Sequence, residues 1–221
     1  MKYRYLSYPI SEGMPVRGGK ADLRIKPARA ISKGDSANVY KFCMESHWGT
    51  HVDAPRHFFD NGKSIEDYPP AAWIFKTPQV IDISLDSSEI LNLGKWTSCI
   101  KTVTDILIFR SGWSRFRKQA RYVDENPGIH PDVGVYLRKK YRNLRAIGID
   151  WISISSVSNK SLGREAHRAF LDPAGNGKPL FIIEDMCLPV ALSGLESLFV
   201  SPLVVSGIDS APCTVLGVFH D

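Results

Sequence analysis

SHWGTHVDAPRHFF, residues 46–59, contains three of the six histidines of this 221-residue chain. Its four candidate ligands, His47, His51, Asp53 and His57, all have odd numbers. Residues of equal parity in an extended segment point to the same face. If the run is extended, these four side chains lie on one surface.

A helix is a poor alternative for this run, because it contains Gly49, Pro55 and two β-branched residues. A fully extended backbone, however, would hold the α-carbons of His47 and His51 about 13 Å apart, at a rise of roughly 3.3 Å per residue. A shared ligand requires a closer approach. We therefore expect a bend at Gly49 and a turn, stiffened by Pro55, that brings His57 toward the other side chains.

Two imidazoles and a carboxylate form a mixed nitrogen and oxygen donor set that suits zinc, manganese or iron(II). Three protein ligands leave a coordination position open for water, as catalytic sites require. The alternative is a group of ordinary hydrogen-bonded histidines, which would be the better interpretation for any one of them alone. The whole set on one face favours a metal site.

Composition places the chain among ordinary globular proteins, with 43% hydrophobic and 23% charged residues. The net charge of +5 is spread along the chain, which argues against a nucleic-acid-binding stripe. No apolar run approaches the ~20 residues that span a bilayer, and the first residues do not resemble a secretory signal. The four cysteines form no Cys-x-x-Cys pair. We expect one domain over residues 1–221, a cytoplasmic location and thiols that serve as small core side chains.

Short apolar runs rich in β-branched residues predict strands at 38–44, 79–84, 105–109, 146–149, 180–184, 203–208 and 214–219. Helical periodicity is clearest over 131–143, where Val135, Leu137 and Tyr141 form the expected buried stripe. A second helix is expected over 163–171, with Ala166 and Phe170 inward. The pattern predicts a mixed α/β fold.

Two distant residues are further candidates for the site. Glu184 ends a strand of apolar residues, and His167 lies in the second expected helix. Carboxylates at strand ends often project into sites at sheet edges, although many are simply solvated. Asp150 is similar but can instead cap a turn. Glu165 and Asp185 remain as neighbouring alternatives.

Residues 47–57, HWGTHVDAPRH, resemble the His-x-Gly-Thr-His-x-Asp-x-Pro-x-His signature of the metal-dependent cyclase-like hydrolases, which include kynurenine formamidase and isatin hydrolase. All seven fixed positions are present. The similarity extends along the chain through LSYPISEGMPV (6–16), ILIFRSGW (106–113), IGID (147–150) and VSGIDSAP (205–212). The resemblance implies a single-domain swivelling β/α/β-type fold and a homodimer or larger homo-oligomer.

The resemblance also implies a role for each candidate residue. His47, His51 and Asp53 would be ligands of a divalent metal, most simply Zn²⁺, with Mn²⁺ or Fe²⁺ as alternatives. His57 would transfer protons beside the metal. His167 and Glu184 would complete a second metal position, with Asp53 shared between the two ions.

The chain departs from the family pattern in three places. Residues 172–179, DPAGNGKP, are inserted between His167 and Glu184, the two residues of the second metal position. Ser155 stands where relatives often carry an aspartate. The early loop PVRGGK (15–20) lacks the aromatic residue of kynurenine formamidases, and its Arg17 and Lys20 are candidates to attract an acidic ligand.

The sequence therefore predicts an arylformamidase-like, metal-dependent hydrolase of a small-molecule amide or lactam, in which the metal activates water. A cyclase or lactone hydrolase using the same site is the alternative within enzymes, and a non-catalytic metal- or small-ligand-binding protein is the alternative outside them. A serine nucleophile is disfavoured because the chain contains no Gly-x-Ser-x-Gly elbow.

Overall fold

A mixed β-sheet forms the centre of the computed structural model, which describes residues 1–188 and 192–220. Within those residues the sheet has nine strands. Eight follow one another in the order β7 (Ile74–Phe75), β14 (Leu195–Pro202), β15 (Ser210–Phe219), β6 (His51–Asp53), β13 (Phe181–Glu184), β12 (Ala146–Ile149), β10 (Ile106–Arg110) and β8 (Pro78–Asp82). β1 (Lys2–Tyr5) also pairs with β15. Because β14 lies against β8 as well, the sheet is nearly closed.

The histidine run enters this sheet through β6, which pairs antiparallel with β13 on one side and with β15 on the other. The register sets His51 opposite Glu184 on β13, and Asp53 opposite Ser210 on β15. Strands β8, β10, β12 and β13 run parallel. The sheet register thus brings residues 51–53 beside a carboxylate more than a hundred positions away.

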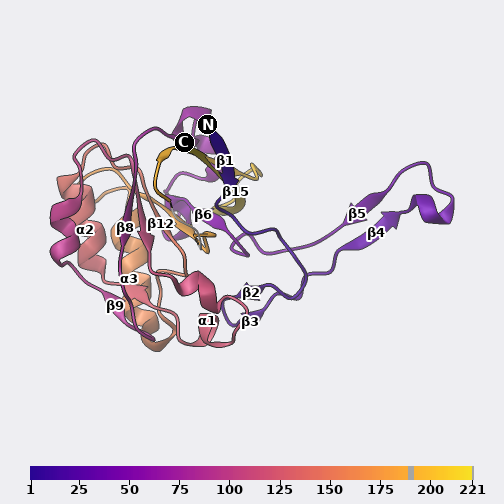
Figure 1. Ribbon diagram of the computed structural model, residues 1–221, viewed down its shortest axis with the longest axis horizontal. Helices are drawn as coiled ribbons and strands as arrows, with labels where there is room; N and C mark the ends of the chain where they lie inside the picture. The colour runs from indigo at the N-terminus through magenta and orange to yellow at the C-terminus, as the bar shows by residue number, and fades with distance from the viewer. Residues whose placement is uncertain (189–191, 221) are drawn as a thin grey trace.

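Helices cover the face of the parallel strands, as Figure 1 shows at the left of the view. α2 (Pro131–Lys140) and α3 (Lys160–Leu171) pack against each other, and α1 (Arg121–Asp124) is a single turn. Pro131 occupies the first turn of α2, and the Asn159 side chain caps α3 by accepting from the Leu162 amide. None of the helices among the described residues has the length and apolar character to cross a membrane.

Two apolar cores lie on opposite faces of the sheet. One, between the sheet and the helices, includes Leu107, Ile149 and Phe170, while the other includes Val52 and Ile108. Adjacent residues of β10 therefore contribute to different cores, which explains why Ile106–Arg110 reads as a continuous apolar run.

Smaller elements surround this body. Paired strands form three further two-stranded sheets: β2 (Pro15–Val16) with β3 (Gly19–Lys20), β4 (Lys26–Arg29) with β5 (Val39–Lys41), and β9 (Ile90–Leu91) with β11 (Gly128–Ile129). The 3₁₀ helices are η1 (Ile31–Lys33), η2 (Pro55–His57), η3 (Ile65–Asp67), η4 (Pro70–Trp73), η5 (Lys95–Cys99), η6 (Trp113–Phe116) and η7 (Val157–Asn159). The β4–β5 hairpin projects away from the body (Figure 1).

Most predicted elements are confirmed, including the helix over 163–171 with Ala166 and Phe170 buried. Three expectations are wrong. Residues 203–208 form a loop and turn, and the strand lies just before them, in β14. Val135 is 51% exposed, because Val133 takes the buried position beside Leu137. Cys43 and Cys99 are exposed, so only Cys213 fits the expected role of a buried core thiol.

Candidate metal centre

The histidine run changes conformation twice within eleven residues. Gly49 has φ of 71°, a left-handed value that other residues rarely adopt, and it makes the expected bend between His47 and β6. Residues 51–53 are extended. Pro55 then begins η2, which ends at His57 and turns it back toward the sheet. The two predicted bends are confirmed, although only three residues of the run form a strand.

Asp53 lies at the centre of the cluster. It is 1% exposed, and neither of its carboxylate oxygens accepts a hydrogen bond from a described residue. Its Oδ1 lies 3.1 Å from His47 Nδ1 and 3.5 Å from His51 Nε2, and its Oδ2 lies 3.8 Å from His167 Nε2. A buried carboxylate without a donor is costly unless a cation compensates its charge.

Two imidazoles present nitrogen lone pairs to this carboxylate. His51 donates from Nδ1 to the Gly49 carbonyl at 2.8 Å, and His167 donates from Nδ1 to the Gly163 carbonyl at 2.8 Å. Because a carbonyl only accepts, Nδ1 carries the proton in both rings, and the neutral form leaves Nε2 with a lone pair. Backbone carbonyls orient metal-bound histidines in the same way.

Glu184 ends β13 and faces the same space. Its Oε1 accepts from the Ile154 amide at 2.7 Å and from Ser153 Oγ at 3.1 Å. Its Oε2 lies 3.5 Å from His51 Nε2, and its Oε1 lies 3.6 Å from His167 Nε2. The loop after β12 therefore holds one oxygen of Glu184, while the other points toward His51.

Asp209 links the two remaining histidines. Its Oδ2 accepts from His47 Nε2 at 3.0 Å and from His57 Nδ1 at 2.8 Å. Ser210 Oγ also lies 2.9 Å from His47 Nε2. With Nε2 donating to Asp209, Nδ1 of His47 faces Asp53, and a proton or a metal ion must lie between them.

The charges of this cluster shift its titration. Burial disfavours the imidazolium of His47, but Asp53 and Asp209 outweigh it and raise the pKa of His47 to about 10. Burial also opposes ionisation of Asp53, yet His47 and His51 hold the pKa of Asp53 well below its usual range. Hydrogen bonds from His47 and His57 likewise lower the pKa of Asp209. Without a metal, a proton on His47 thus balances part of the carboxylate charge.

The spacing fits a metal ion. Donor atoms of His47, Asp53 and His57 lie within 4.8 Å of one another, as do those of His51, Asp53 and Glu184. Two ligands of a tetrahedral ion with bonds of about 2 Å lie roughly 3.3 Å apart, close to the 3.1 and 3.5 Å that separate Asp53 Oδ1 from the two histidine nitrogens. Asp53 belongs to both groups, so it can be shared by two ions.

Phe58 forms part of the wall beside these groups. Its ring stacks on the His167 imidazole, with centroids 4.9 Å apart, and lies edge-on to His57 at 4.7 Å. Phe58, the residue directly after the signature, therefore contacts both His57 and His167.

The structure brings together all six predicted site residues: His47, His51, Asp53, His57, His167 and Glu184. The geometric groups, however, place His57 with His47 and Asp53, a position compatible with a ligand as well as with proton transfer. The division of roles among the six stays a prediction.

The other acidic residues considered for the site, Asp150, Glu165 and Asp185, have different roles or positions. Asp150 caps the turn after β10 by accepting from the amides of Ser111 and Gly112, as its position in the sequence allowed. Glu165 is exposed, and Asp185 is engaged by Arg117 and Tyr122.

Ser155, Arg17 and Lys20, the residues at which the sequence departs from the family pattern, differ in their distance from the cluster. Ser155 Oγ lies 3.2 Å from His167 Nδ1. Arg17 and Lys20 are exposed, and Lys20 lines a cavity that none of the six cluster residues lines.

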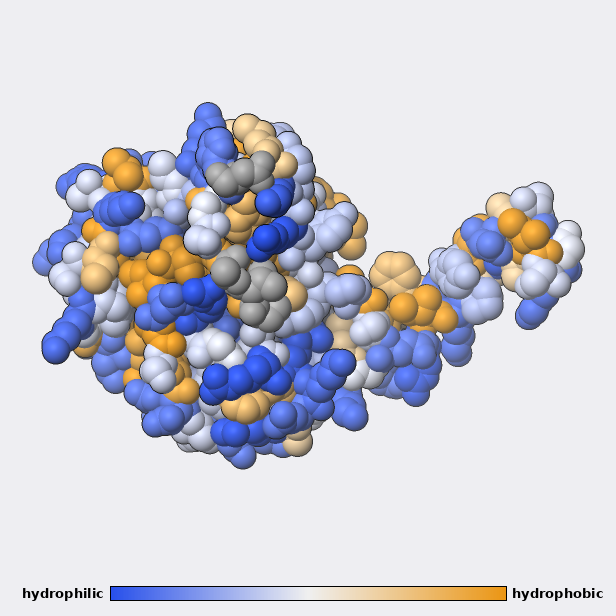
Figure 2. Space-filling view, viewed as in Figure 1, coloured by the Kyte–Doolittle hydropathy of each residue, from blue (hydrophilic) through white to orange (hydrophobic). Residues whose placement is uncertain are grey.

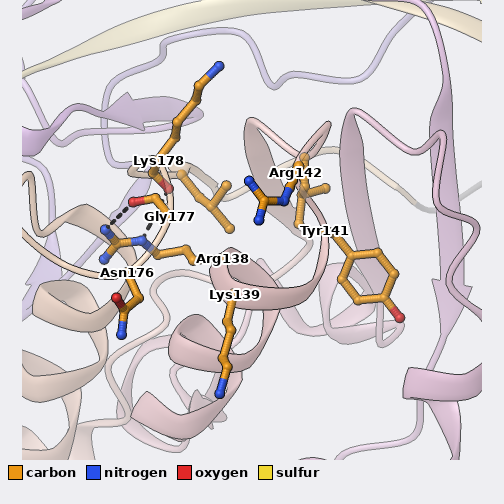
Figure 3. Close-up of a pocket in the computed structure, with 9 residues that line it drawn as sticks. Arg138, Lys139, Tyr141, Arg142, Asn176, Gly177 and Lys178 are labelled. Atoms are coloured by element: carbon orange, nitrogen blue, oxygen red, sulfur yellow. Dashed lines mark hydrogen bonds between the residues drawn. The ribbon is translucent and has the colours of Figure 1, made fainter.

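Residues 172–179, which the resemblance predicts to be an insertion, are held against α2 by Arg138 of that helix, and His167 and Glu184 both reach the cluster. Arg138 donates to the carbonyls of Ala169, Asp172, Gly177 and Lys178. Figure 3 shows this guanidinium beside the loop, at a cavity of about 460 Å³. Gly177 has φ of 87°, and a Cβ there would lie 2.3 Å from the Arg138 carbonyl oxygen. Residues 172–179 therefore fold against α2, at a cavity that none of the six cluster residues lines.

The sequence interpretation missed Asp209, which touches two of the candidate residues. The signal was present, because an acid that follows the apolar run LVVSGI is the same kind of candidate as Glu184. The pattern predicts a strand over 203–208, and Asp209 follows the end of that run directly.

Comparisons with known proteins show the family of the chain. The family model described as "Putative cyclase" matches residues 5–156. The kynurenine formamidase of Bacillus thuringiensis subsp. konkukian (strain 97-27) is 27% identical over 208 residues, covering 94% of this chain and 92% of the relative. That of Geobacillus thermodenitrificans (strain NG80-2) is 28% identical over 214 residues, with the same coverage.

The structural comparison concerns the fold alone. Isatin hydrolase A from Labrenzia aggregata, solved with benzyl benzoate bound, matches with a TM-score of 0.82 at 22% identity and covers 100% of this chain and 94% of that one. The predicted mixed α/β fold of the cyclase-like hydrolases is confirmed.

Proposed function

This chain belongs to the cyclase family, and from that premise we propose that it is a metal-dependent hydrolase of a small-molecule amide or lactam C–N bond. The observation that carries the proposal is the buried Asp53 carboxylate, which lacks any described donor and faces the nitrogens of three histidines. The kynurenine formamidase relatives cover nearly the whole chain and favour an arylformamidase-like reaction.

We propose that His47, His51 and Asp53 hold the first ion, and that His167 and Glu184 hold a second with Asp53 shared. The donor set suits Zn²⁺ best, with Mn²⁺ and Fe²⁺ as alternatives. A bound divalent cation supplies Lewis-acid polarisation of a carbonyl and lowers the pKa of water.

His57 is the proposed proton-transfer residue. Asp209 accepts from its Nδ1 at 2.8 Å, so Nε2 of the neutral ring carries the lone pair. From there His57 can accept a proton from the attacking water and deliver it to the leaving nitrogen. Asp209 fixes the tautomer and the ring orientation, as the carboxylate of a His–Asp pair does.

We further propose that residues 1–221 form one domain, that the protein acts in the cytoplasm and that it assembles as a homodimer or larger homo-oligomer. The similarity to the kynurenine formamidases over nearly their whole length supports the first of these.

Elemental analysis of protein purified without added metal tests the site before any substrate is chosen. We expect at least one zinc, manganese or iron ion per chain. Metal-loaded protein should then hydrolyse N-formylkynurenine or isatin in preference to simple lactones. His220→Ala, at an exposed histidine far along the chain, is the matched control and should retain both metal and activity. Protein that binds none of these ions would refute the proposal, and turnover of lactones alone would replace the substrate class.

A further inference from the structure

Asp185 directly follows Glu184, and the proposed function gives it no role. It is fully buried, and its φ of 52° lies in the left-handed region. Among the described residues other than glycine, only Ser88 shares such a value, and Ser88 lies in a turn, where left-handed residues are common. Asp185 instead forms a bend at the end of β13. Because glycine would adopt this conformation without strain, the carboxylate itself has to account for an aspartate here.

Three hydrogen bonds hold the Asp185 carboxylate. Arg117 donates from Nε to Oδ1 at 2.9 Å and from Nη2 to Oδ2 at 2.7 Å. The Tyr122 hydroxyl donates to Oδ1 at 2.5 Å. The Arg117 guanidinium lies 3.8 Å from the centroid of the Tyr8 ring, and the Arg117 side chain is only 14% exposed. Since a two-pronged guanidinium contact fixes direction as well as distance, the carboxylate is held in one orientation.

The backbone of Asp185 is fixed as well. Its amide donates to the Trp151 carbonyl at 3.0 Å, and its carbonyl accepts from Thr50 Oγ1 at 2.6 Å. Thr50 Oγ1 in turn accepts from the Tyr8 amide at 3.0 Å. Every polar group of Asp185 therefore has a partner.

These contacts lie beside two candidate metal ligands. Thr50 directly precedes His51. Asp185 directly follows Glu184, which the sheet register places opposite His51. His51 Nε2 lies 3.5 Å from Glu184 Oε2, close to the roughly 3.3 Å that separates two ligands of a tetrahedral ion. Because the hydrogen bond from Thr50 to Asp185 joins the two strands next to this pair, a shift of Asp185 would move Glu184 relative to His51.

Stability alone does not explain the contacts of Asp185. A buried ion pair contributes little net stability, because the desolvation of both charges offsets their attraction. The left-handed backbone adds a further conformational cost. Strained residues persist where the surrounding structure holds them in place, and they cluster at functional sites. The neighbouring residue that needs a fixed geometry is Glu184.

We propose that Asp185 is a positioning residue: Arg117 and Tyr122 hold its carboxylate, and Asp185 thereby sets the distance from Glu184 to His51 that a divalent ion requires. The inference rests on the proposed metal site and adds residues that are not proposed ligands. Loss of a group that orients a ligand lowers metal affinity by about 10–100-fold, and this is the effect expected when the Asp185 carboxylate is removed.

Calorimetric titration of the full chain with Zn²⁺ tests the proposal on three variants. Asp185→Gly permits the left-handed backbone and removes the carboxylate, so the metal affinity should fall by about 10–100-fold. Asp185→Asn retains an oxygen that can accept from Tyr122 and should lose less. Asp105→Asn is the matched control, because Asp105 pairs with Arg145 at the opposite end of the same parallel strands. The control should bind Zn²⁺ like the wild type.

A double variant separates positioning from folding. Arg117→Met alone leaves the buried Asp185 charge unpaired and should lower the unfolding temperature of the metal-free protein. Arg117→Met with Asp185→Asn removes both charges, so the unfolding temperature should recover, whereas the metal affinity should stay low. The double variant also decides the question if Asp185→Gly does not fold.

Thr50 gives an independent test of the same geometry. Thr50→Ser keeps the hydroxyl that donates to the Asp185 carbonyl and should bind Zn²⁺ nearly as the wild type does. Thr50→Val removes this hydroxyl and should weaken binding. Equal affinity of the two variants would contradict a role for this contact in setting the position of Glu184.

The outcomes distinguish this inference from the proposed function. Wild-type affinity in Asp185→Gly, or an affinity that recovers together with stability in the double variant, would overturn the inference and leave the metal site in place. A wild-type protein that binds neither Zn²⁺ nor Mn²⁺ would overturn the proposed function, and the inference with it.

Discussion

The metal cluster and the projecting arm, residues 24–43 around the β4–β5 hairpin, are neighbours in sequence, yet they are built in opposite ways. The cluster collects side chains from β6, β13, α3 and the turn before β15, and Asp53, His51, His167 and Glu184 are each 1–3% exposed. The buried carboxylates of the cluster need a cation to compensate their charge.

The arm comes from one continuous stretch and buries almost nothing of its own. Figure 2 shows hydrophobic residues along this projecting part of the chain, in which Tyr40 and Phe42 are 59% and 56% exposed. The exposed apolar side chains of the arm are typical of a surface that another apolar surface covers.

Replacing the shared ligand should have the largest effect. Asp53→Asn keeps the shape of the side chain and removes the charge that three histidines face. Metal affinity should fall by more than about 100-fold, beyond the usual cost of losing a residue that only supports a ligand, and turnover should fall to background. Calorimetric titration with Zn²⁺ and Mn²⁺ measures this. Asp132→Asn, at an exposed carboxylate on α2, should bind metal normally.

His57→Ala should separate proton transfer from metal binding. We expect kcat to fall by about 10²–10⁴, the usual contribution of a positioned acid or base, with metal content nearly unchanged. The geometry also permits His57 to join His47 and Asp53 around one ion. Loss of metal from this variant would therefore make His57 a ligand and move the proton-transfer role elsewhere.

Asp209→Ala should have an intermediate effect. The substitution removes the oxygen that accepts from both His47 and His57. Loss of such a supporting partner lowers metal affinity or activity by about 10–100-fold. Because Ser210 still contacts His47, we expect kcat to fall more than metal affinity. Asp209→Asn retains an accepting oxygen and should recover part of the loss. Equal activity of all three proteins would remove Asp209 from the mechanism.

The cluster was largely predictable from the sequence because its central part is local. The spacing of His51 and Asp53 places both on one face of a strand, and Gly49 and Pro55 predict the bends on either side. Glu184 and His167 come from other elements, and only the family resemblance linked them to the run. Asp209 is brought to the site by the pairing of β15 with β6, a long-range register that local pattern does not determine.

The arm shows the limit of local pattern more clearly. Residues 38–44 were expected to be a strand, and β5 lies within them, but periodicity carries no information on whether a strand joins the central sheet or leaves the body. The error at 203–208 is related. The apolar residues of 203–208 predict a buried strand, whereas Leu203, Val204 and Val205 lie in an exposed loop. The strand is β14, in which buried Leu198, Val200 and Pro202 alternate with exposed Phe199 and Ser201.

The smallest effect is expected when the arm is changed and the metal affinity of the cluster is measured. Tyr40→Ser with Phe42→Ser changes no candidate ligand, and substitutions without shared partners are additive within about 0.5 kcal/mol, or roughly twofold in affinity. Metal affinity of this variant, measured by the same titration, should therefore equal that of the wild type within about twofold. A larger change would mean that the arm, from its own chain or a second copy, contributes to the metal cluster. The metal site would then include residues of the arm, and the cluster and the arm would not be independent of each other.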